Sequence, residues 1–325
     1  MLFKKILFAV LSALFFFLPM FLPQFRDYAP GVAVITGVIF AVTAGNPFSE
    51  ITGRNTSLLL GIAIVGMGCA MDIVAVLKAG ASGFIYTFIG IAAGLGLGVL
   101  FGKLLKINSS VMYLVSVGTS ICGGSAIAAA APAIRAKAHD IAIAGATVFT
   151  LNAIALLIFP AVGRMLGMDQ QQFGYWAALA IHDTSSVVGA TLQYGEEALE
   201  IGTTVKLARA LWIVPVTVFL SVLAASGEEG GKGKIKVKVP WFIPGFLIAA
   251  AIYTFFPVLA DAGKFCKDIS KYLMVLTLFF IGANLSREKL RELGFKPVLH
   301  GIVLWIILSV GWCAAIVSGV VKCSK

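Results

Sequence analysis

The chain is divided into long apolar stretches, and this division limits its fold more than any other feature. An α-helix needs roughly 20 apolar residues to cross a bilayer. Eleven stretches approach that length, at 6–22, 29–45, 57–77, 81–101, 111–131, 140–163, 172–193, 203–224, 240–258, 270–288 and 297–321. No soluble domain remains between them. We therefore expect one all-α polytopic membrane domain over residues 1–325 with about 11 transmembrane helices.

Composition and charge agree with a membrane protein. The chain is 59% hydrophobic and 12% charged, whereas soluble domains are about 45–50% apolar and about 25% charged. Its net charge of +10 is explained by basic cytoplasmic loops. With a cytoplasmic N-terminus, just over half of the basic residues fall on that side, most densely at Lys232–Lys238. Basic residues are not interleaved with aromatic ones, so we expect no nucleic-acid partner.

The N-terminus and the cysteines exclude other classes. Residues 1–22 resemble a signal peptide, but they lack a small-x-small cleavage site and contain Pro19, so we expect a retained helix. The five cysteines are scattered without a C-x-x-C pair, which indicates neither a disulfide framework nor a metal cluster. We expect no cofactor and no metal.

The number of stretches predicts an internal repeat. Eleven divide into one extra N-terminal helix (1–28) and two sets of five (29–163 and 164–325). Sets with an odd number of helices have opposite orientations, as in inverted-repeat transporters. The fourth stretch of each set contains glycine and a polar residue, at Gly123-Gly124 and at Gly282–Asn284. We therefore expect two broken helices that cross.

The first interruption predicts a binding site. A break inside a membrane survives only where it lines a cavity or packs within protein. A helix that restarts near Ser125 directs free N–H groups and its positive end into that cavity, which favours an anion. The alternative is a glycine-rich packing face, and Asn284 has the alternative of a helix cap. We assign substrate binding to Thr119, Ser120, Gly123, Gly124, Ser125, Asn284, Lys206 and Arg209.

Ionisable residues inside predicted spans suggest coupling to an ion. His182 shares a helix face with Ser185 and Gly189, while Asp183 lies about 100° round. This pair is suited to holding H⁺ or Na⁺, with helix packing as the alternative. Lys206 and Arg209 are one turn apart and suit an oxyanion, or else a helix-end ion pair. We interpret Asn152 and Asp72 as structural, and Cys122 as a small packing residue.

These motifs together resemble a known family. Thr119–Ile127, Pro132 with Arg135 and Lys137, His182-Asp183, the Lys206–Pro215 stretch and Gly282–Asn284 occur in its order. The chain is similar to the sulfate exporter family of YeiH-like bacterial inner-membrane proteins. The resemblance implies the sodium/proton antiporter-like fold of the cation/proton antiporter and anion transporter group. In that fold a panel domain meets a core domain with two crossing broken helices, here the fifth and tenth spans.

We accordingly predict a secondary active transporter of a small anion, sulfate or a related sulfur-containing anion, coupled to H⁺ or Na⁺. The resemblance implies a bacterial inner-membrane location, with a cytoplasmic N-terminus and a periplasmic C-terminus, and allows a homodimer. No P-loop motif is present, so ATP is not expected to drive transport directly. The alternatives are a passive anion channel or a membrane receptor. An intramembrane enzyme that uses Cys122 or a serine with His182 is a remote alternative, and we expect no enzyme.

Overall fold

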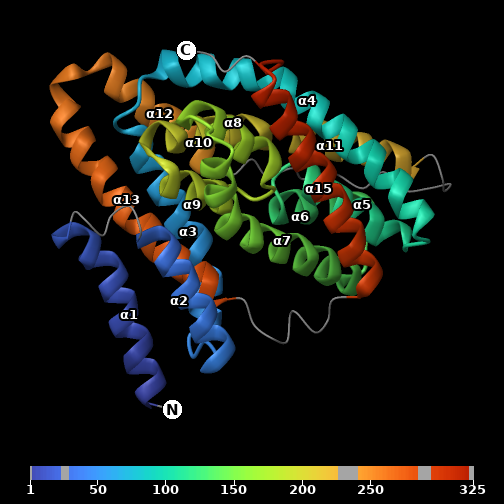
Figure 1. Ribbon diagram of the computed structural model, residues 1–325, viewed down its shortest axis with the longest axis horizontal. Helices are drawn as coiled ribbons and strands as arrows, with labels where there is room; N and C mark the ends of the chain where they lie inside the picture. The colour runs from blue at the N-terminus through green and yellow to red at the C-terminus, as the bar shows by residue number, and fades with distance from the viewer. Residues whose placement is uncertain (1, 23–28, 226–240, 285–293, 322–325) are drawn as a thin grey trace.

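The computed structural model describes residues 2–22, 29–225, 241–284 and 294–321, and this part of the chain is α-helical without strands (Figure 1). The helices are α1 (Leu2–Phe21), α2 (Ala29–Thr43), α3 (Ser49–Gly68), α4 (Ile73–Leu104), α5 (Ser109–Ser120), α6 (Gly124–Ala133), α7 (Ala138–Met165), α8 (Gln170–Ala180), α9 (Thr184–Tyr194), α10 (Glu196–Ala210), α11 (Ile213–Ala225), α12 (Phe242–Phe255), η2 (Pro257–Leu259), α13 (Ala260–Ala283) and α15 (Phe295–Val317).

Polar side chains define where several helices begin. The Asp72 carboxylate accepts hydrogen bonds from the N–H groups of Val74 and Ala75, both at 2.9 Å, at the start of α4. Asn108 caps α5 in the same way. Asp169 and Gln172 form a reciprocal capping box at α8. These caps satisfy N–H groups that have no partner within the helix. The structural interpretation of Asp72 is thereby confirmed.

The helices form two groups (Figure 1). The first group contains α1, α2, α3, α12 and α13. The second group contains α4 to α11 and α15. The groups meet mainly where α2 and α13 pack against α9, and where α12 packs against α4. The first group thus combines the N-terminal helices α1 to α3 with α12 and α13. The second group combines the central helices α4 to α11 with the C-terminal helix α15. The predicted division at residues 28 and 163 stays a prediction.

Five helices of the described part are long and apolar enough to cross a membrane: α1, α4, α7, α10 with α11, and α15. The α12 and η2–α13 helices form a sixth candidate, bent by 107°. The remaining predicted spans correspond to α2, to α3 and to the interrupted pairs α5–α6 and α8–α9. The predicted total of eleven is therefore not confirmed.

The interruption predicted at Gly282–Asn284 falls at the end of the described helix α13 and is not confirmed. Helix α13 continues through Gly282 to Ala283, and Asn284 is its C-cap. Gly282 permits close helix packing instead: a Cβ added there would lie 2.3 Å from the Val34 carbonyl oxygen of α2. Gly37 of α2 meets α13 equally closely. Residues 285–288 of the predicted span lie outside the described residues.

The second broken helix is found elsewhere, in the span predicted at 172–193. Helix α8 ends at Ala180 and α9 begins at Thr184. His182 and Asp183 therefore lie in an extended segment, and the continuous helix face predicted for His182, Ser185 and Gly189 is wrong. The physical reason is that Asp183 caps α9 with its side chain, so the chain stops and restarts its helix at this residue.

Candidate functional site

The two breaks lie against each other. The first separates α5 from α6, as the Gly123-Gly124 motif predicts, and the second separates α8 from α9. Gly123 has φ +66°, a left-handed conformation that favours glycine. A Cβ added at Gly123 would lie 3.3 Å from the Asp183 Cβ and 3.6 Å from the Asn152 side-chain nitrogen. Glycine thus allows the first break to approach the second.

We call the following residues the break site: Gly123, Asn152, His182, Asp183, Lys206 and Arg209. They come from the two breaks, from α7 and from α10. All of them except Asp183 are buried, and Asp183 is partly exposed.

Lys206 holds the two breaks together. Its side chain is fully buried. The ammonium nitrogen donates to the carbonyl oxygens of Ile121 at 3.0 Å and Ile181 at 2.7 Å, with a third contact to Ala178 at 3.5 Å. Three carbonyl acceptors match the three donors of an ammonium group. The cation therefore satisfies carbonyls that are left free where α5 and α8 end.

Arg209 performs the same role one helical turn later. It is 1% exposed, and its Nε donates to the Ser120 carbonyl oxygen at 2.9 Å. Its Nη1 donates to the carbonyl oxygens of Leu179 at 2.6 Å and Ala178 at 3.1 Å. Cations at helix C-termini are favoured by the helix dipole. Lys206 and Arg209, both predicted to bind the anion, thus donate these hydrogen bonds to backbone carbonyl groups at the ends of α5 and α8.

The N-termini of α6 and α9 differ in how they are capped. The Asp183 carboxylate accepts from the Ser186 N–H at 3.2 Å and also from the Ser185 hydroxyl. Helix α9 therefore begins on an anion supplied by its own chain. Helix α6 begins after Gly123, which provides no side-chain cap. An uncapped N-terminus of a ten-residue helix is suited to an external anion.

Asn152 is a site residue that the sequence interpretation assigned only to structure. It is 2% exposed, and its side-chain oxygen accepts the His182 N–H at 3.0 Å. Its side-chain nitrogen, which faces Gly123, has no hydrogen-bond partner within the described residues, and neither ring nitrogen of His182 has one. Buried polar groups normally have partners. These three unpaired atoms therefore indicate a place for a polar ligand.

The hydroxyl groups predicted to bind the substrate, those of Thr119, Ser120 and Ser125, do not gather at the break site. Thr119 and Ser120 donate back to carbonyl oxygens of their own helix, Val115 at 2.9 Å and Ser116 at 2.6 Å respectively. Ser125 is exposed. Cys122 is buried at the break, as expected of a packing residue.

Asn284 belongs to a different polar cluster. Its side-chain oxygen accepts from Asn46 at 2.9 Å and from the Thr52 hydroxyl at 2.7 Å. Its nitrogen contacts the Thr56 hydroxyl at 3.5 Å. Asn284 thus links the end of α13 to the start of α3. None of the other residues predicted to bind substrate is among these hydrogen-bond partners.

The electrostatics of the break site favour an anion. Two helix C-termini and two helix N-termini meet there, and their partial charges of roughly half a unit each cancel. Lys206 and Arg209 are two basic side chains, and Asp183 supplies the carboxylate among the described residues at the breaks. Basic groups therefore outnumber the carboxylate there. An isolated buried charge is costly, so a counter-ion is favoured.

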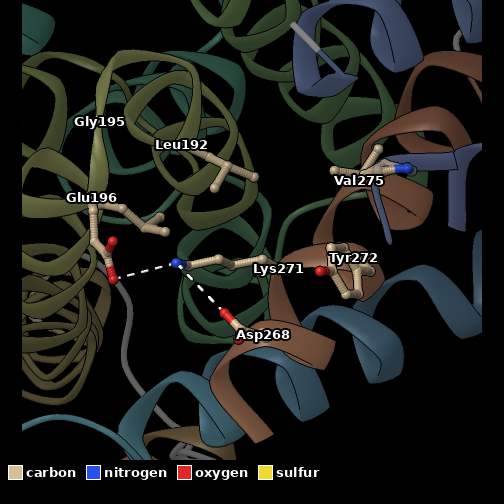
Figure 2. A pocket seen from close by; sticks show the side chains of 9 residues that line it. Leu192, Gly195, Glu196, Asp268, Lys271, Tyr272 and Val275 are labelled. Carbon is tan, nitrogen blue, oxygen red and sulfur yellow. Dashed lines mark hydrogen bonds and ion pairs between the residues drawn. The ribbon is translucent and has the colours of Figure 1, made fainter. Parts of the chain in front are cut away.

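A separate pocket of about 170 Å³ lies between the two helix groups. Figure 2 shows Lys271 of α13 between Glu196 and Asp268 on the wall of this pocket. The Lys271 nitrogen lies 3.2 Å from the Glu196 carboxylate and 3.9 Å from that of Asp268. The charges on this wall are therefore compensated by one another, which makes the pocket a weaker candidate for an ion than the break site.

Comparison with known proteins places the chain in a family. A family model described as Conserved hypothetical protein 698 matches residues 1–301. The chain belongs to this family. UPF0324 membrane protein Bd1437 of Bdellovibrio bacteriovorus is 50% identical over 297 residues, 91% of each chain. A UPF0324 membrane protein of Bacteroides thetaiotaomicron is 43% identical over 326 residues, covering 96% of this chain and 95% of its own.

These relatives and the apolar helices support a multi-pass membrane protein, whereas the orientation of the termini stays a prediction. Among solved structures, the sodium/proton antiporter MjNhaP1 of Methanocaldococcus jannaschii is 14% identical with a TM-score of 0.28, covering 98% of this chain and 100% of its own. A similarity this low does not define the fold of the Conserved hypothetical protein 698 family member described here.

Proposed function

We propose that this protein is a secondary transporter of a small oxyanion and that the anion binds at the break site. The observation behind this proposal is the pairing of two buried cations with one carboxylate beside the uncapped α6 N-terminus. Sulfate and related sulfur oxyanions fit, because they accept hydrogen bonds from several donors at once. This substrate class also follows the resemblance to the YeiH-like sulfate exporters.

The arrangement explains how the anion is bound. Backbone N–H groups at the start of α6 and the unpaired Asn152 amide are the donors that face the first break. Lys206 and Arg209 contribute through their charge, since their described hydrogen bonds go to carbonyl groups. A buried charge acts more strongly than it does in water because the local dielectric is low.

Asp183 provides the coupling to protons. Its carboxylate occupies the α9 N-terminus and lies beside Gly123, so it repels an anion that binds there. Protonation of Asp183 removes this repulsion. One proton therefore binds together with the anion and crosses the membrane with it. His182, which is buried with both ring nitrogens unpaired, provides a second proton acceptor beside it.

Flux measurements in proteoliposomes test the proposal. Purified protein is reconstituted, and uptake of radiolabelled sulfate, sulfite and thiosulfate is measured with and without a pH gradient, and with a sodium gradient. We expect uphill movement of at least one anion when the pH gradient is present. Flux that requires the sodium gradient would show that Na⁺, and not H⁺, is the coupling ion. Absence of flux for every anion would overturn the transport proposal, and current through single open pores would favour the channel.

The Asp183→Asn variant tests the coupling. In the wild type, the Asp183 carboxylate beside Gly123 repels the bound anion unless it carries the coupled proton. In the variant this charge is gone, so anion affinity should exceed the wild-type value and should depend less on pH. Equilibrium binding to detergent-solubilised protein measures this. Identical pH profiles for the two proteins would contradict the role of Asp183.

The break site gives no reason to propose an enzyme. Its serine hydroxyl at Ser185 donates to Asp183, and the His182 ring has no hydrogen bond to a serine or cysteine within the described residues.

A further inference from the structure

A cysteine pair lies outside the break site, although the two residues are far apart in the sequence. Cys69 follows the last residue of α3, and Cys266 lies in α13. The Cys69 thiol donates to the Val65 carbonyl oxygen at 3.7 Å, and the two cysteine positions meet where α3 contacts α13. Neither takes part in a disulfide in this structure. The pair therefore places two reduced thiols on facing segments of one helix interface.

The backbones of the two helices are unusually close at this point. A Cβ added at Gly263, one turn before Cys266, would lie 2.0 Å from the Cys69 carbonyl oxygen. A Cβ added at Gly66 would lie 3.5 Å from the Cys266 carbonyl oxygen and 2.0 Å from the Ser270 hydroxyl. Glycine on both helices thus permits the short backbone separation that a disulfide requires.

The two cysteines differ in accessibility. Cys266 is exposed, whereas Cys69 is only partly exposed. Cys266 also lies among charged residues of α13, next to Lys267 and two positions after Lys264, and Cys69 lies three positions before the exposed Asp72. The charged surroundings place the pair at the water-exposed end of both helices.

From this contact and these accessibilities we propose that Cys69 and Cys266 form a redox modification site, which a small-molecule disulfide converts to an intramolecular disulfide. The Cys266 thiolate attacks one sulfur of the small disulfide, forming a mixed disulfide and releasing one thiolate. The Cys69 thiolate then attacks the Cys266 sulfur and releases the second thiolate. Two protein thiols are oxidised, one small disulfide is reduced, and the two protons pass to the released thiols.

The test uses full-length protein in which the other cysteines, Cys122, Cys313 and Cys323, are replaced by serine. The protein is incubated with glutathione disulfide, and the remaining thiols are counted with a maleimide mass tag. We expect both thiols to disappear together, a Cys69–Cys266 linked peptide in the mass spectrum, and recovery of both thiols with dithiothreitol.

Two further variants make the order of reaction visible. In the Cys69→Ser variant, Cys266 should retain a stable glutathione adduct, because no second thiol displaces it. In the Cys266→Ser variant, Cys69 should react at least tenfold more slowly. Persistence of both free thiols, accumulation of the glutathione adduct on Cys266 in the intact pair, or a link between two chains would each overturn the proposal. These outcomes do not depend on transport activity.

Discussion

Single residues set the geometry of the break site. Gly123 turns the chain with a positive φ, and Asn152 fixes the second break by accepting the His182 N–H. Asp183 begins α9 and faces Gly123. Each residue acts on the backbone as well as on the ligand. Substitutions here should therefore alter stability and binding together, and these effects need separate measurements.

The Gly123→Ala variant should be destabilised by about 1–2 kcal/mol, because a non-glycine residue is strained in the left-handed region. Its Cβ would also press against Asp183 at 3.3 Å. Gly96→Ala in α4 is the matched control, since an added Cβ there meets nothing within 4 Å and alanine favours a helix by up to about 1 kcal/mol. Thermal unfolding in detergent measures both. Equal stability of the two variants would contradict the strain at Gly123.

Sequence and structure agree at one break and differ at the other for identifiable reasons. Adjacent glycines at 123 and 124 indicate an interrupted helix because helices disfavour glycine. The second break has no glycine, and His182 and Asp183 follow the apolar run Trp176–Ile181. A signal was nevertheless present: Asp183 followed by serines is typical of a helix N-cap. Gly282 does not interrupt α13, since glycine also serves close helix packing, and only the α2–α13 contact distinguishes the two uses.

At the scale of elements, α10 connects the two broken helices. Lys206 and Arg209 project from it to the ends of α5 and α8. The cations therefore stabilise a structure in which two helices stop within the protein interior. The spacing of these residues, one turn apart, is visible in the sequence, but their carbonyl partners are not, because the partners lie 25 to 89 positions away.

The Lys206→Met variant should be destabilised by about 1–3 kcal/mol, because buried carbonyl groups lose their donor. It should also lose most anion affinity, since the break site loses a positive charge. Lys264→Met is the control: this lysine is exposed and pairs only with its helix neighbour Asp261 among the described ion pairs, so a change within about 0.5 kcal/mol is expected. Chemical unfolding and equilibrium binding provide the readouts. Unchanged anion affinity in a folded Lys206→Met protein would contradict the electrostatic role.

At the scale of the whole molecule, an ion-pair cluster links the two helix groups. Lys267 of α13 lies 2.5 Å from Glu196 and 2.8 Å from Glu200, both in α10. Lys271 adds a further contact to Glu196 (Figure 2). Transport by alternating access moves one group relative to the other. Such motion would stretch this cluster, so its strength should influence the rate.

The Lys267→Met variant should increase anion flux about two- to fivefold at low ionic strength, because a partly exposed ion pair contributes up to about 1 kcal/mol. High salt should reduce this difference, since it screens the pair in the wild type. The Glu200→Gln/Lys267→Met double variant should behave like Lys267→Met alone, because Glu200 pairs only with Lys267 among the described ion pairs. Proteoliposome flux at two salt concentrations checks these expectations. Additive effects of the substitutions would show that the residues act independently.

The break site is assembled from one continuous portion of the chain, with every member between Gly123 and Arg209. The ribosome therefore completes all of its residues before it makes the final third of the protein. Helix α15 arrives last and packs against α5, α7 and α8, where the Ser309 carbonyl accepts the Trp176 indole N–H at 2.9 Å. The two cations, by contrast, find their carbonyl partners at Ser120, Ile121, Leu179 and Ile181, which are made before them, so during synthesis the site can assemble before α15 packs on it.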